Sequence, residues 1–444
     1  MLSVLTNRTY GHLFAAQVIA LVGTGLATVA LGLLAYEIAG TDAGAVLGTA
    51  LAIKMVAYIG IAPVVGAYAD RLPRKTLLVA MDVVRAVVAM ALPFVDAVWQ
   101  IYLLIFLLQS ASAAFTPTFQ ATIPDILPDE EEYTTALSLS RLAYDLESLL
   151  SPILAAALLT VINFHWLFAG TSVGFVISAM LVVTSALPHR QAAKKIVESV
   201  WRKTTRGARI YLRTPRLVGL LAVTLAAAAG SAMVIVNTVV IVKGMGRSQE
   251  DVALALAAYG GGSMLAALIL PRVLRSISDR SVMITGAFLL TATLSVFAMM
   301  TLGTAGLIAW PFLLGGWLVL GVTYSLSVTP GGRLLRRSSN EGDRPALFAA
   351  QFALSHVCWL LAYPVAGQIG ANSGMGVAFS ALAAIAAIGA ISALWLWPKV
   401  DPEEIAHEHP ELPSDHPHLS RQGSGEHSHP FVIDELHGRW PGRP

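Results

Sequence analysis

Apolar residues recur along this chain in long runs separated by short polar loops. A hydrocarbon core about 30 Å thick is crossed by roughly 20 apolar residues in an α-helix. Twelve runs reach that length, and each predicts a transmembrane helix. They cover approximately residues 12 to 38, 44 to 68, 76 to 95, 99 to 121, 135 to 161, 164 to 187, 217 to 242, 251 to 271, 281 to 302, 308 to 330, 346 to 369 and 375 to 397. The pattern therefore predicts an all-α polytopic membrane protein.

Three pairs of features repeat at a spacing of about 210 residues, and such a period indicates internal repetition. The pairs are Asp70-Arg71 with Asp279-Arg280, Pro152 with Pro364, and Arg8 with Arg216. Two pseudo-symmetric six-helix halves, residues 1 to 188 and 217 to 398, account for them. Large secondary transporters have this plan, with the substrate site near the midplane between the halves.

Two polar segments complete the organisation. Residues 189 to 216 are strongly basic and divide six apolar runs from six. They predict a cytoplasmic linker with a short amphipathic helix on the anionic inner leaflet, the alternative being a solvated tether. Residues 399 to 444 are rich in Pro, His, Asp, Glu, Gly and Ser, so we expect a disordered tail without a core of its own.

Composition supports lipid as the solvent and indicates the orientation. Only 13% of the residues are charged and 56% are hydrophobic, whereas soluble domains carry about 25% charged residues. Lys and Arg gather in alternate loops, and the opposite loops contain only Lys243 and Arg247. Positive residues in short loops stay in the cytoplasm. We therefore expect a multi-pass protein of a bacterial inner membrane with both termini in the cytoplasm.

The loop after the second run, GAYADRLPRKTLL at residues 66 to 78, contains the most recognisable motif. It resembles the signature loop of the major facilitator superfamily, G-x-x-x-D-R-x-G-R-R/K, with Pro73 in place of the usual glycine. Physically, such a polar cluster can hold two halves together in one state and release them in another. The residues that we assign to this gating loop are Gly66, Asp70, Arg71, Arg74 and Lys75.

The resemblance extends over residues 1 to about 398 and implies the major facilitator fold. TPTFQATIPDILPDEEEYTTALSLSRL, residues 116 to 142, is similar to the branch that contains macrolide and siderophore exporters. RLAYDLESLLSP and SHVCWLLAYPVAG, together with a histidine-rich tail, resemble the bacterial nickel-resistance exporters of that superfamily. This resemblance implies an exporter, not an enzyme, with nickel and cobalt as candidate substrates.

Charged residues inside the runs are candidates for the transport path, because each costs at least about 2.5 kcal/mol near the bilayer centre. Lys54, Asp145, Glu147 and His356 are assigned to transport and proton coupling. His356 matches Tyr144 at the Pro152-to-Pro364 spacing, so Asp145 and His356 are expected near each other. Nitrogen and oxygen ligands suit Ni(II), Co(II) and Zn(II).

The remaining charges inside the runs have simpler explanations. Asp82 and Arg85 are three residues apart and predict a structural pair. Arg141 and Asp145 are four apart, so an intrahelical salt bridge explains them as well as a site does. Cys358, the one cysteine, lies two residues after His356 and is a further, softer ligand candidate. The alternative for His356 is an ordinary interior histidine.

The tail concentrates histidines, mostly as H-x-H pairs. Residues two apart in an extended chain lie on the same side, so each pair can chelate one ion. The candidate metal ligands are His407, His409, His416, His418, His427, His429 and His437. The alternative is a polar extension whose histidines are incidental.

These observations leave three functions open. The first is export of divalent nickel or cobalt by proton antiport, with the tail collecting metal. The second is a proton-coupled exporter of drugs or siderophores, and the third is a non-transporting metal sensor. No G-x-x-x-x-G-K-[ST] loop occurs, so a proton gradient is the expected energy source. We expect a monomer in the lipid bilayer with metal ions and protons as partners, no nucleic acid and no resident cofactor.

Overall fold

The computed structural model describes residues 2–68, 73–187, 200–303, 308–340, 343–401, 404–407, 427–434 and 436–441. Almost all are helical. The helices are α1 (Arg8–Ala39), α2 (Ala43–Tyr68), α3 (Arg74–Ala91), α4 (Val98–Ile126), α5 (Glu130–Leu159), α6 (His165–Thr184), α7 (Val200–Arg213), α8 (Pro215–Gly244), α9 (Gln249–Val273), α10 (Asp279–Gly303), α11 (Trp310–Val328), α12 (Gly331–Arg337), α13 (Arg344–Pro364), α14 (Gly370–Ser373) and α15 (Met375–Leu396). Short 3-10 turns cover Leu2–Thr6, Gly40–Asp42 and Leu92–Phe94, and a π-helical turn covers Val365–Ile369.

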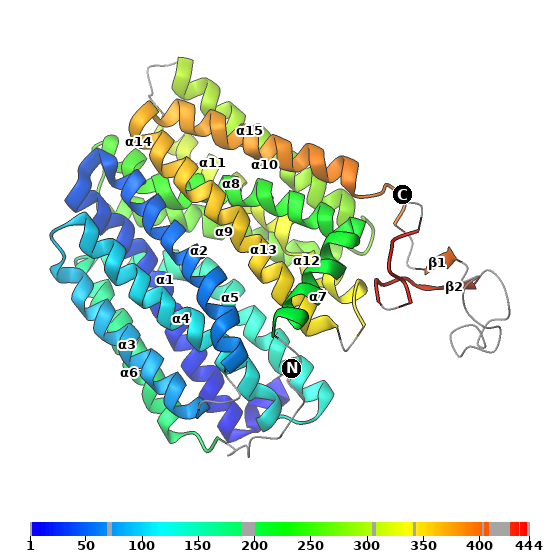
Figure 1. Cartoon of the computed structure of the whole chain (residues 1–444). Coiled ribbons are helices and arrows are strands. Elements are labelled where there is room, and N and C mark those ends of the chain that lie inside the picture. The colour runs from blue at the N-terminus through cyan, green and yellow to red at the C-terminus, as the bar shows by residue number, and fades with distance from the viewer. Residues whose placement is uncertain are drawn as a thin grey trace.

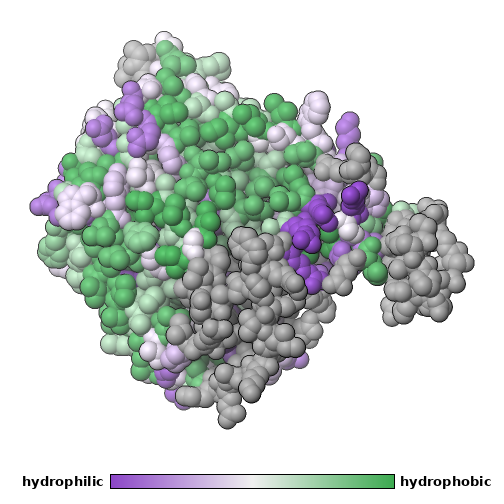
Figure 2. All heavy atoms as spheres, in the orientation of Figure 1, coloured by the Kyte–Doolittle hydropathy of each residue, from purple (hydrophilic) through white to green (hydrophobic). Residues whose placement is uncertain are grey.

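The predicted spans each fall on a described helix, which confirms the all-α polytopic fold. Among the described residues, ten helical stretches are long and apolar enough to cross a membrane, and the first, Arg8–Ile61, contains α1 and most of α2. In the described part of α5, the apolar stretch is the shorter Leu150–Leu159. Figure 2 shows hydrophobic side chains over most of the coloured surface, with hydrophilic residues gathered toward its left and right margins. This distribution fits a protein surrounded by lipid.

The helices pack as two groups, α1–α6 and α8–α15 (Figure 1). In the first, α6 contacts α1 and α3, and α4 contacts α2 and α3. In the second, α15 contacts α8 and α10, and α11 contacts α9 and α10. The groups meet mainly where α5 packs on α9 and α2 packs on α13. We call these groups the N half and the C half, and the two contacts between them the junction.

Small residues let α8 lie at the centre of the C half. Ala226 to Ala229 are fully buried, and Gly230 packs so closely that an added Cβ would lie 2.8 Å from a methyl carbon of Leu290. Backbones approach this closely in membranes where side chains are small. The end of the bundle where α1 begins and α2 ends is called the basic end below, because Arg8, Arg74 and Lys75 lie there.

The linker helix α7 lies against the C half. Its Gly207 contacts the carbonyl oxygen of Ala346 at the start of α13, and Tyr211, fully buried, donates a hydrogen bond to Gln351. Arg206 forms an ion pair of 2.8 Å with Asp343. Part of the basic segment is thus a helix that packs on protein through Gly207 and Tyr211, and its predicted position on the inner leaflet stays a prediction.

Candidate functional site

A seam of glycines joins α2 to α13 at the end of the bundle opposite the basic end. A Cβ added at Gly48 would lie 2.5 Å from the carbonyl oxygen of Tyr363 and 3.2 Å from the Cα of Gly367. Gly44 makes a similarly close backbone contact with Gly367. These four residues, the glycine seam, close this end of the junction because no side chain separates the two backbones.

A π-helical turn shapes the α13 side of the seam. Pro364 has no N–H to donate to the preceding turn, and the helix widens into Val365–Ile369 directly after it. Asn237 of α8, fully buried, donates a 3.0 Å hydrogen bond from Nδ2 to the carbonyl of Ala366 within this turn. Gln368 donates to the hydroxyl of Thr49 on α2 at 3.2 Å. Polar contacts therefore hold the turn against both halves.

Two opposite charges lie at the junction, Lys54 on α2 and Glu147 on α5. The two side chains interact electrostatically. Both lie deep among protein atoms yet keep part of their surface accessible. Glu147 faces α1, where a Cβ added at Gly25 would lie 2.7 Å from its Oε1. Ser151, one turn further along α5, has a buried hydroxyl without a hydrogen-bond partner in the described structure.

His356 lies on the C-half side of the same region. Its ring stacks on Tyr58 of α2 with centroids 5.4 Å apart, and the Phe352 ring lies 4.0 Å away. His356 Nδ1 is 2.6 Å from the carbonyl oxygen of Phe352. Lys54 also interacts electrostatically with His356. The structure thus brings together Lys54, Glu147 and His356, three residues that the sequence assigned to transport.

Other predicted residues are placed differently or lie outside the description. The side chains of Asp145 and Arg141 are outside the described part of the chain, so their predicted contacts remain predictions. Cys358 is buried, with Sγ 3.6 Å from the carbonyl of Leu354 on its own helix. Within the described residues, no group of three or more His, Cys, Asp or Glu side chains is arranged to hold a metal ion.

Sequence reasoning missed an aromatic cluster in the C half. Tyr259 of α9 and Tyr324 of α11 have ring centroids 5.9 Å apart, and both interact electrostatically with Tyr363 of α13. Trp359 of α13 donates from Nε1 to the hydroxyl of Ser231 on α8 at 2.9 Å. No sequence motif marks these residues, because they come from four helices. They place aromatic rings with polar edges near the glycine seam.

The described part of the gating loop binds within the N half. Arg74 forms an ion pair with Asp125 at the end of α4, and Lys75 donates to the carbonyl of Ser185 after α6 at 3.0 Å. Gly66 lies in α2, and Asp70 and Arg71 lie outside the described residues. In this state Arg74 and Lys75 therefore tie α3 to α4 and α6, and the predicted role of the loop in gating stays a prediction.

Asp82 and Arg85 form the ion pair that their spacing predicts. Both are buried, and Ser178 of α6 donates to the second carboxylate oxygen of Asp82 at 2.8 Å. The Arg85 guanidinium lies between the rings of Phe115 and Phe175, 4.2 and 4.5 Å from their centroids. These contacts join α3, α4 and α6 away from the junction, so the pair is structural.

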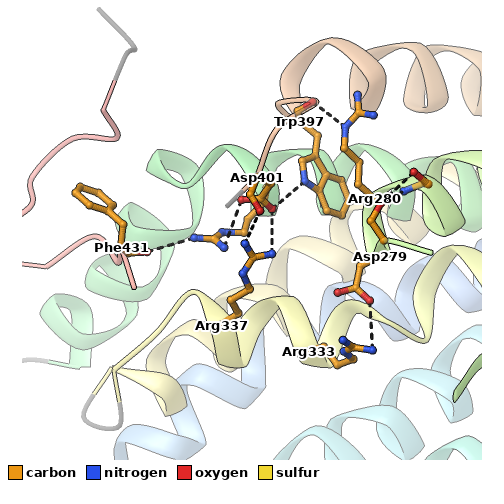
Figure 3. Close-up of polar contacts among 10 residues, drawn as sticks. Asp279, Arg280, Arg333, Arg337, Trp397, Asp401 and Phe431 are labelled. Atoms are coloured by element: carbon orange, nitrogen blue, oxygen red, sulfur yellow. Dashed lines mark hydrogen bonds and ion pairs between the residues drawn. The ribbon is translucent and has the colours of Figure 1, made fainter. Parts of the chain in front are cut away.

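The C half has its own charged cluster at the basic end (Figure 3). Asp279 faces Arg333 at 3.7 Å. Arg280 donates to the carbonyls of Trp397 and Leu394, both at 3.1 Å, at the end of α15. This contact mirrors that of Lys75 with Ser185, since in both halves a cation at the start of the third helix binds the end of the sixth. The repeat is therefore visible in side-chain contacts as well as in helix order.

The described parts of residues 399 to 444 differ from the disorder expected there. β1 (Glu404–His407) pairs with β2 (His427–Pro430) in antiparallel register, which places His407 opposite His427. Residues 431–434 and 436–441, the docked segment, bury Phe431 and Trp440 in the main hydrophobic core. Trp440 lies under Arg216 of α8, with the guanidinium carbon 4.8 Å from the ring centroid. Arg216 also donates to the carbonyl of Phe431 at 3.2 Å, the bond marked by the dashed line at Phe431 in Figure 3.

His437 belongs to this docked segment and is separate from the hairpin histidines. It is buried, and its Nδ1 lies 2.9 Å from Asp434 Oδ1. Partial burial acts to raise the pKa of the Asp434 carboxyl. Hydrogen bonds from the His437 ring, the His437 backbone and the Leu436 backbone outweigh burial and lower this pKa to about 2. Of the other predicted ligands, His409, His416 and His418 lie outside the described residues, as do the side chains of His407, His427 and His429.

Two helical halves that meet beside the opposite charges of Lys54 and Glu147 have the arrangement of a polytopic membrane transporter of the two-repeat class. The family model described as Major Facilitator Superfamily matches residues 13–246 and 220–423. The chain therefore belongs to the Major Facilitator Superfamily, as its loop motif predicts.

Individual relatives are distant. Macrolide efflux protein A of Streptococcus pyogenes is 25% identical over 181 residues, which cover 40% of this chain and 44% of that protein. The chain thus spans less than half the length of this relative. A bacterial homologue of the human lysosomal transporter Spinster aligns with a TM-score of 0.67 at 11% identity, over 88% of this chain and 97% of its own. A D-xylose-proton symporter aligns with a TM-score of 0.63 at 14% identity, over 90% and 98% of the two chains. These structural matches establish the fold alone.

Proposed function

We propose that this protein is a secondary transporter that exports small amphipathic organic molecules in exchange for protons. The observation that carries the proposal is the composition of the junction. Lys54 and Glu147 supply charge from the N half, whereas Tyr259, Tyr324 and Tyr363 supply aromatic surface from the C half. An organic molecule uses both kinds of surface, and ligand sites are typically apolar with a few placed polar groups.

The direction of transport and the energy source follow from further observations. The partial similarity to macrolide efflux proteins favours export. The basic end is assigned to the cytoplasm because Lys and Arg gather there. The glycine seam then closes the junction on the outer side, so that Lys54 and Glu147 belong to an inward-facing or occluded state. The sequence lacks a nucleotide-binding loop, which favours a proton gradient as the driving force.

Everted membrane vesicles test this function. In vesicles acidified inside, the protein is expected to accumulate amphipathic probes such as erythromycin, and nigericin, which collapses the pH gradient, is expected to abolish that accumulation. Vesicles without the protein provide the control. Equal accumulation with and without nigericin would reject proton coupling, and no accumulation of any organic probe would reject organic export.

Export of nickel or cobalt is the second candidate, and the tail hairpin favours it. The register that sets His407 opposite His427 brings together two of the residues proposed as metal ligands. Two histidines on neighbouring strands can share one divalent ion. Nickel flux in the same vesicles, with Asp145→Asn in parallel, tests this candidate. Gradient-dependent nickel accumulation that Asp145→Asn abolishes would make metal export the leading function.

A further inference from the structure

The linker helix α7 and the first helix of the C half, α8, are separated by a break in the helix at Thr214. Thr214 has an extended backbone, with φ −96° and ψ 107°, and Pro215 follows it. Proline disfavours helical backbone at the residue before it, so the sequence itself sets this break. Any change in the angle between α7 and α8 therefore takes place at Thr214 and Pro215, which we call the hinge.

The docked segment binds both sides of this hinge. Before the hinge, Arg213 donates to the carbonyl of Gly438 at 2.9 Å. After it, Arg216 donates to the carbonyl of Phe431 and lies over the ring of Trp440. These contacts persist together only while α7 and α8 keep their present angle. The docked segment therefore favours one arrangement of the hinge.

The docked segment is held together by its own contacts. The Phe431 ring packs against the rings of His437 and Trp440, with centroids 4.7 and 5.2 Å apart. The backbone N–H of Asp434 donates to the carbonyl of His437 at 3.3 Å, and this turn brings Gly438 back beside α7. Because the rings fix the segment internally, its contacts with α7 and with α8 form and break together.

α7 lies at the opposite end of α13 from the glycine seam. Its Gly207 and Tyr211 pack on the start of α13, whereas Tyr363 of the seam lies near the end of that helix. α7 also contacts α2 of the N half (Figure 1). When the halves rock to open the seam, the basic ends of α2 and α13 approach each other. Because α7 lies against both helices, this approach requires α7 to move at the hinge.

Arg216 keeps a partner when the docked segment leaves. Its side chain is 1% exposed, and its Nη1 lies 3.5 Å from Oδ1 of Asp401, which precedes the tail hairpin. A buried guanidinium that loses its carboxylate is strongly destabilising. Asp401 prevents that outcome, so the docked segment can leave Arg216 without stranding a buried charge.

We propose that the docked segment is an autoinhibitory clamp. Bound to Arg213 and Arg216, it fixes the hinge, keeps α7 against α2 and α13, and holds the protein in the state with the glycine seam closed. Its release frees α7, so that the basic end closes and the seam opens. A contact shifts such an equilibrium only by binding one state better than the other. Attachment on both sides of the hinge supplies that difference, whatever the substrate.

Cysteine labelling tests the clamp without a substrate. Gln368→Cys beside the seam, in a Cys358→Ser background, is labelled with an impermeant maleimide from the outer side. The compared variants are deletion of residues 431–444 and Arg213→Ala. Arg209→Ala is the matched control, since Arg209 is an exposed arginine of the same helix. Thermal unfolding in detergent shows whether each variant folds, and Arg213→Ala decides the test if the deletion does not.

Loss of the clamp should raise labelling at the seam. The deletion removes every contact of the docked segment and should increase the labelling rate roughly tenfold or more. Arg213→Ala removes one hydrogen bond and should increase the rate about threefold. Arg209→Ala should label at the rate of the reporter alone.

A reversible cross-link tests the clamp in the opposite direction. Nothing lies within 4 Å of a Cβ added at Gly438, so Gly438→Cys fits, and Arg213→Cys places a second thiol opposite it. In a Cys358→Ser background, a bifunctional methanethiosulfonate reagent that joins the two cysteines should stop exchange of erythromycin across the membrane. Dithiothreitol should restore the exchange. Gly438→Cys alone, treated with the same reagent, should continue to exchange.

Three results would overturn the proposal. Labelling that the deletion and Arg213→Ala leave unchanged would show that the segment does not hold the seam closed. An equal rise in Arg209→Ala would assign the effect to the charge of α7. Exchange that continues in the cross-linked protein would show that the hinge need not move. If wild type exchanges no erythromycin, the proposed function fails, and the labelling experiment still decides the clamp.

Discussion

Gly48 of α2 and Tyr363 of α13 lie so close that a Cβ atom added to the glycine would be 2.5 Å from the tyrosine carbonyl oxygen. Gly48→Ala is therefore expected to separate the seam and favour the state in which it is open. Overpacking costs about 1–3 kcal/mol, which corresponds to a change of about 5-fold to 160-fold in the open population. The reporter is Gln368→Cys in a Cys358→Ser background. With Gly48→Ala added, this cysteine should react faster with an impermeant maleimide from the outer side than it does with Gly48 unchanged.

The control for the seam is Gly60→Ala on the same helix. Nothing lies within 4 Å of a Cβ added at Gly60. This variant should label at the background rate and transport normally. Equal labelling in the two variants would show that the seam is not the outer closure.

The pair of Asp82 and Arg85 predicts a large effect on stability without a role in transport. Asp82→Ala leaves a buried guanidinium without its carboxylate, and breaking such a pair costs about 3–5 kcal/mol. Thermal unfolding in detergent should show a clear loss. The double variant Asp82→Leu with Arg85→Met replaces both charges by apolar groups and should recover most of the stability and transport. A stable double variant without transport would instead place this pair in the mechanism.

The docked segment predicts that part of the tail is required for local stability. Trp440 is 9% exposed and lies against Arg216. Trp440→Ala should cost about 3 kcal/mol of docking energy, and hydrogen exchange of residues 431–441 should accelerate about a hundredfold. Trp395 on α15 is 82% exposed, so Trp395→Ala provides a matched control without effect. Unchanged protection in Trp440→Ala would mean that the segment is held by other contacts.

The contact between Asp434 and His437 predicts how docking responds to acid. The pKa of Asp434 is about 2 in the folded state, below its ordinary value of 3.8. A carboxyl whose pKa is lowered by folding stabilises the fold at pH values above its ordinary pKa. This contribution is lost as the pH falls through its pKa in the folded state. Protection of residues 431–441, corrected for intrinsic exchange, should hold from pH 7 to about pH 4 and weaken between about pH 4 and pH 2.

Asp434→Asn is the control for that pH response. The amide keeps the size of the side chain but has no carboxyl to protonate. The segment should be less protected at pH 7, and its protection should change little between pH 4 and pH 2. A steep loss in the variant over that interval would assign the response to another group.

The positions of the helices could be predicted closely because hydropathy is a local property. The run expected at 44 to 68 is α2, Ala43–Tyr68, and the run expected at 12 to 38 is α1, Arg8–Ala39, whose start is fixed by the Asn7 side chain accepting from Thr9 and Tyr10. The run expected at 135 to 161 begins earlier, at Glu130, because acidic residues are favourable in the first turn of a helix even though they are not apolar.

The candidate site could be predicted only in part. Lys54, Glu147 and His356 were identifiable because a charge inside an apolar run is costly and therefore conspicuous. The tyrosine cluster was not, since tyrosine is common in membrane helices and its three members are far apart in the chain. Docking of the tail was also hidden, because Arg216, which binds it, was assigned only to the basic linker and to the repeat with Arg8.

The sequence by itself determined where the apolar helices lie along the chain, the repeat of two halves and the family, because each depends on hydrophobicity or spacing along the chain. Tertiary structure decided which charges lie close together and which glycines close the junction. It also decided that His437, unlike the hairpin histidines, is a buried partner of Asp434. Those outcomes depend on contacts between residues as far as 319 positions apart. The energy of such a contact is determined by packing and by the local dielectric, neither of which a one-dimensional pattern contains.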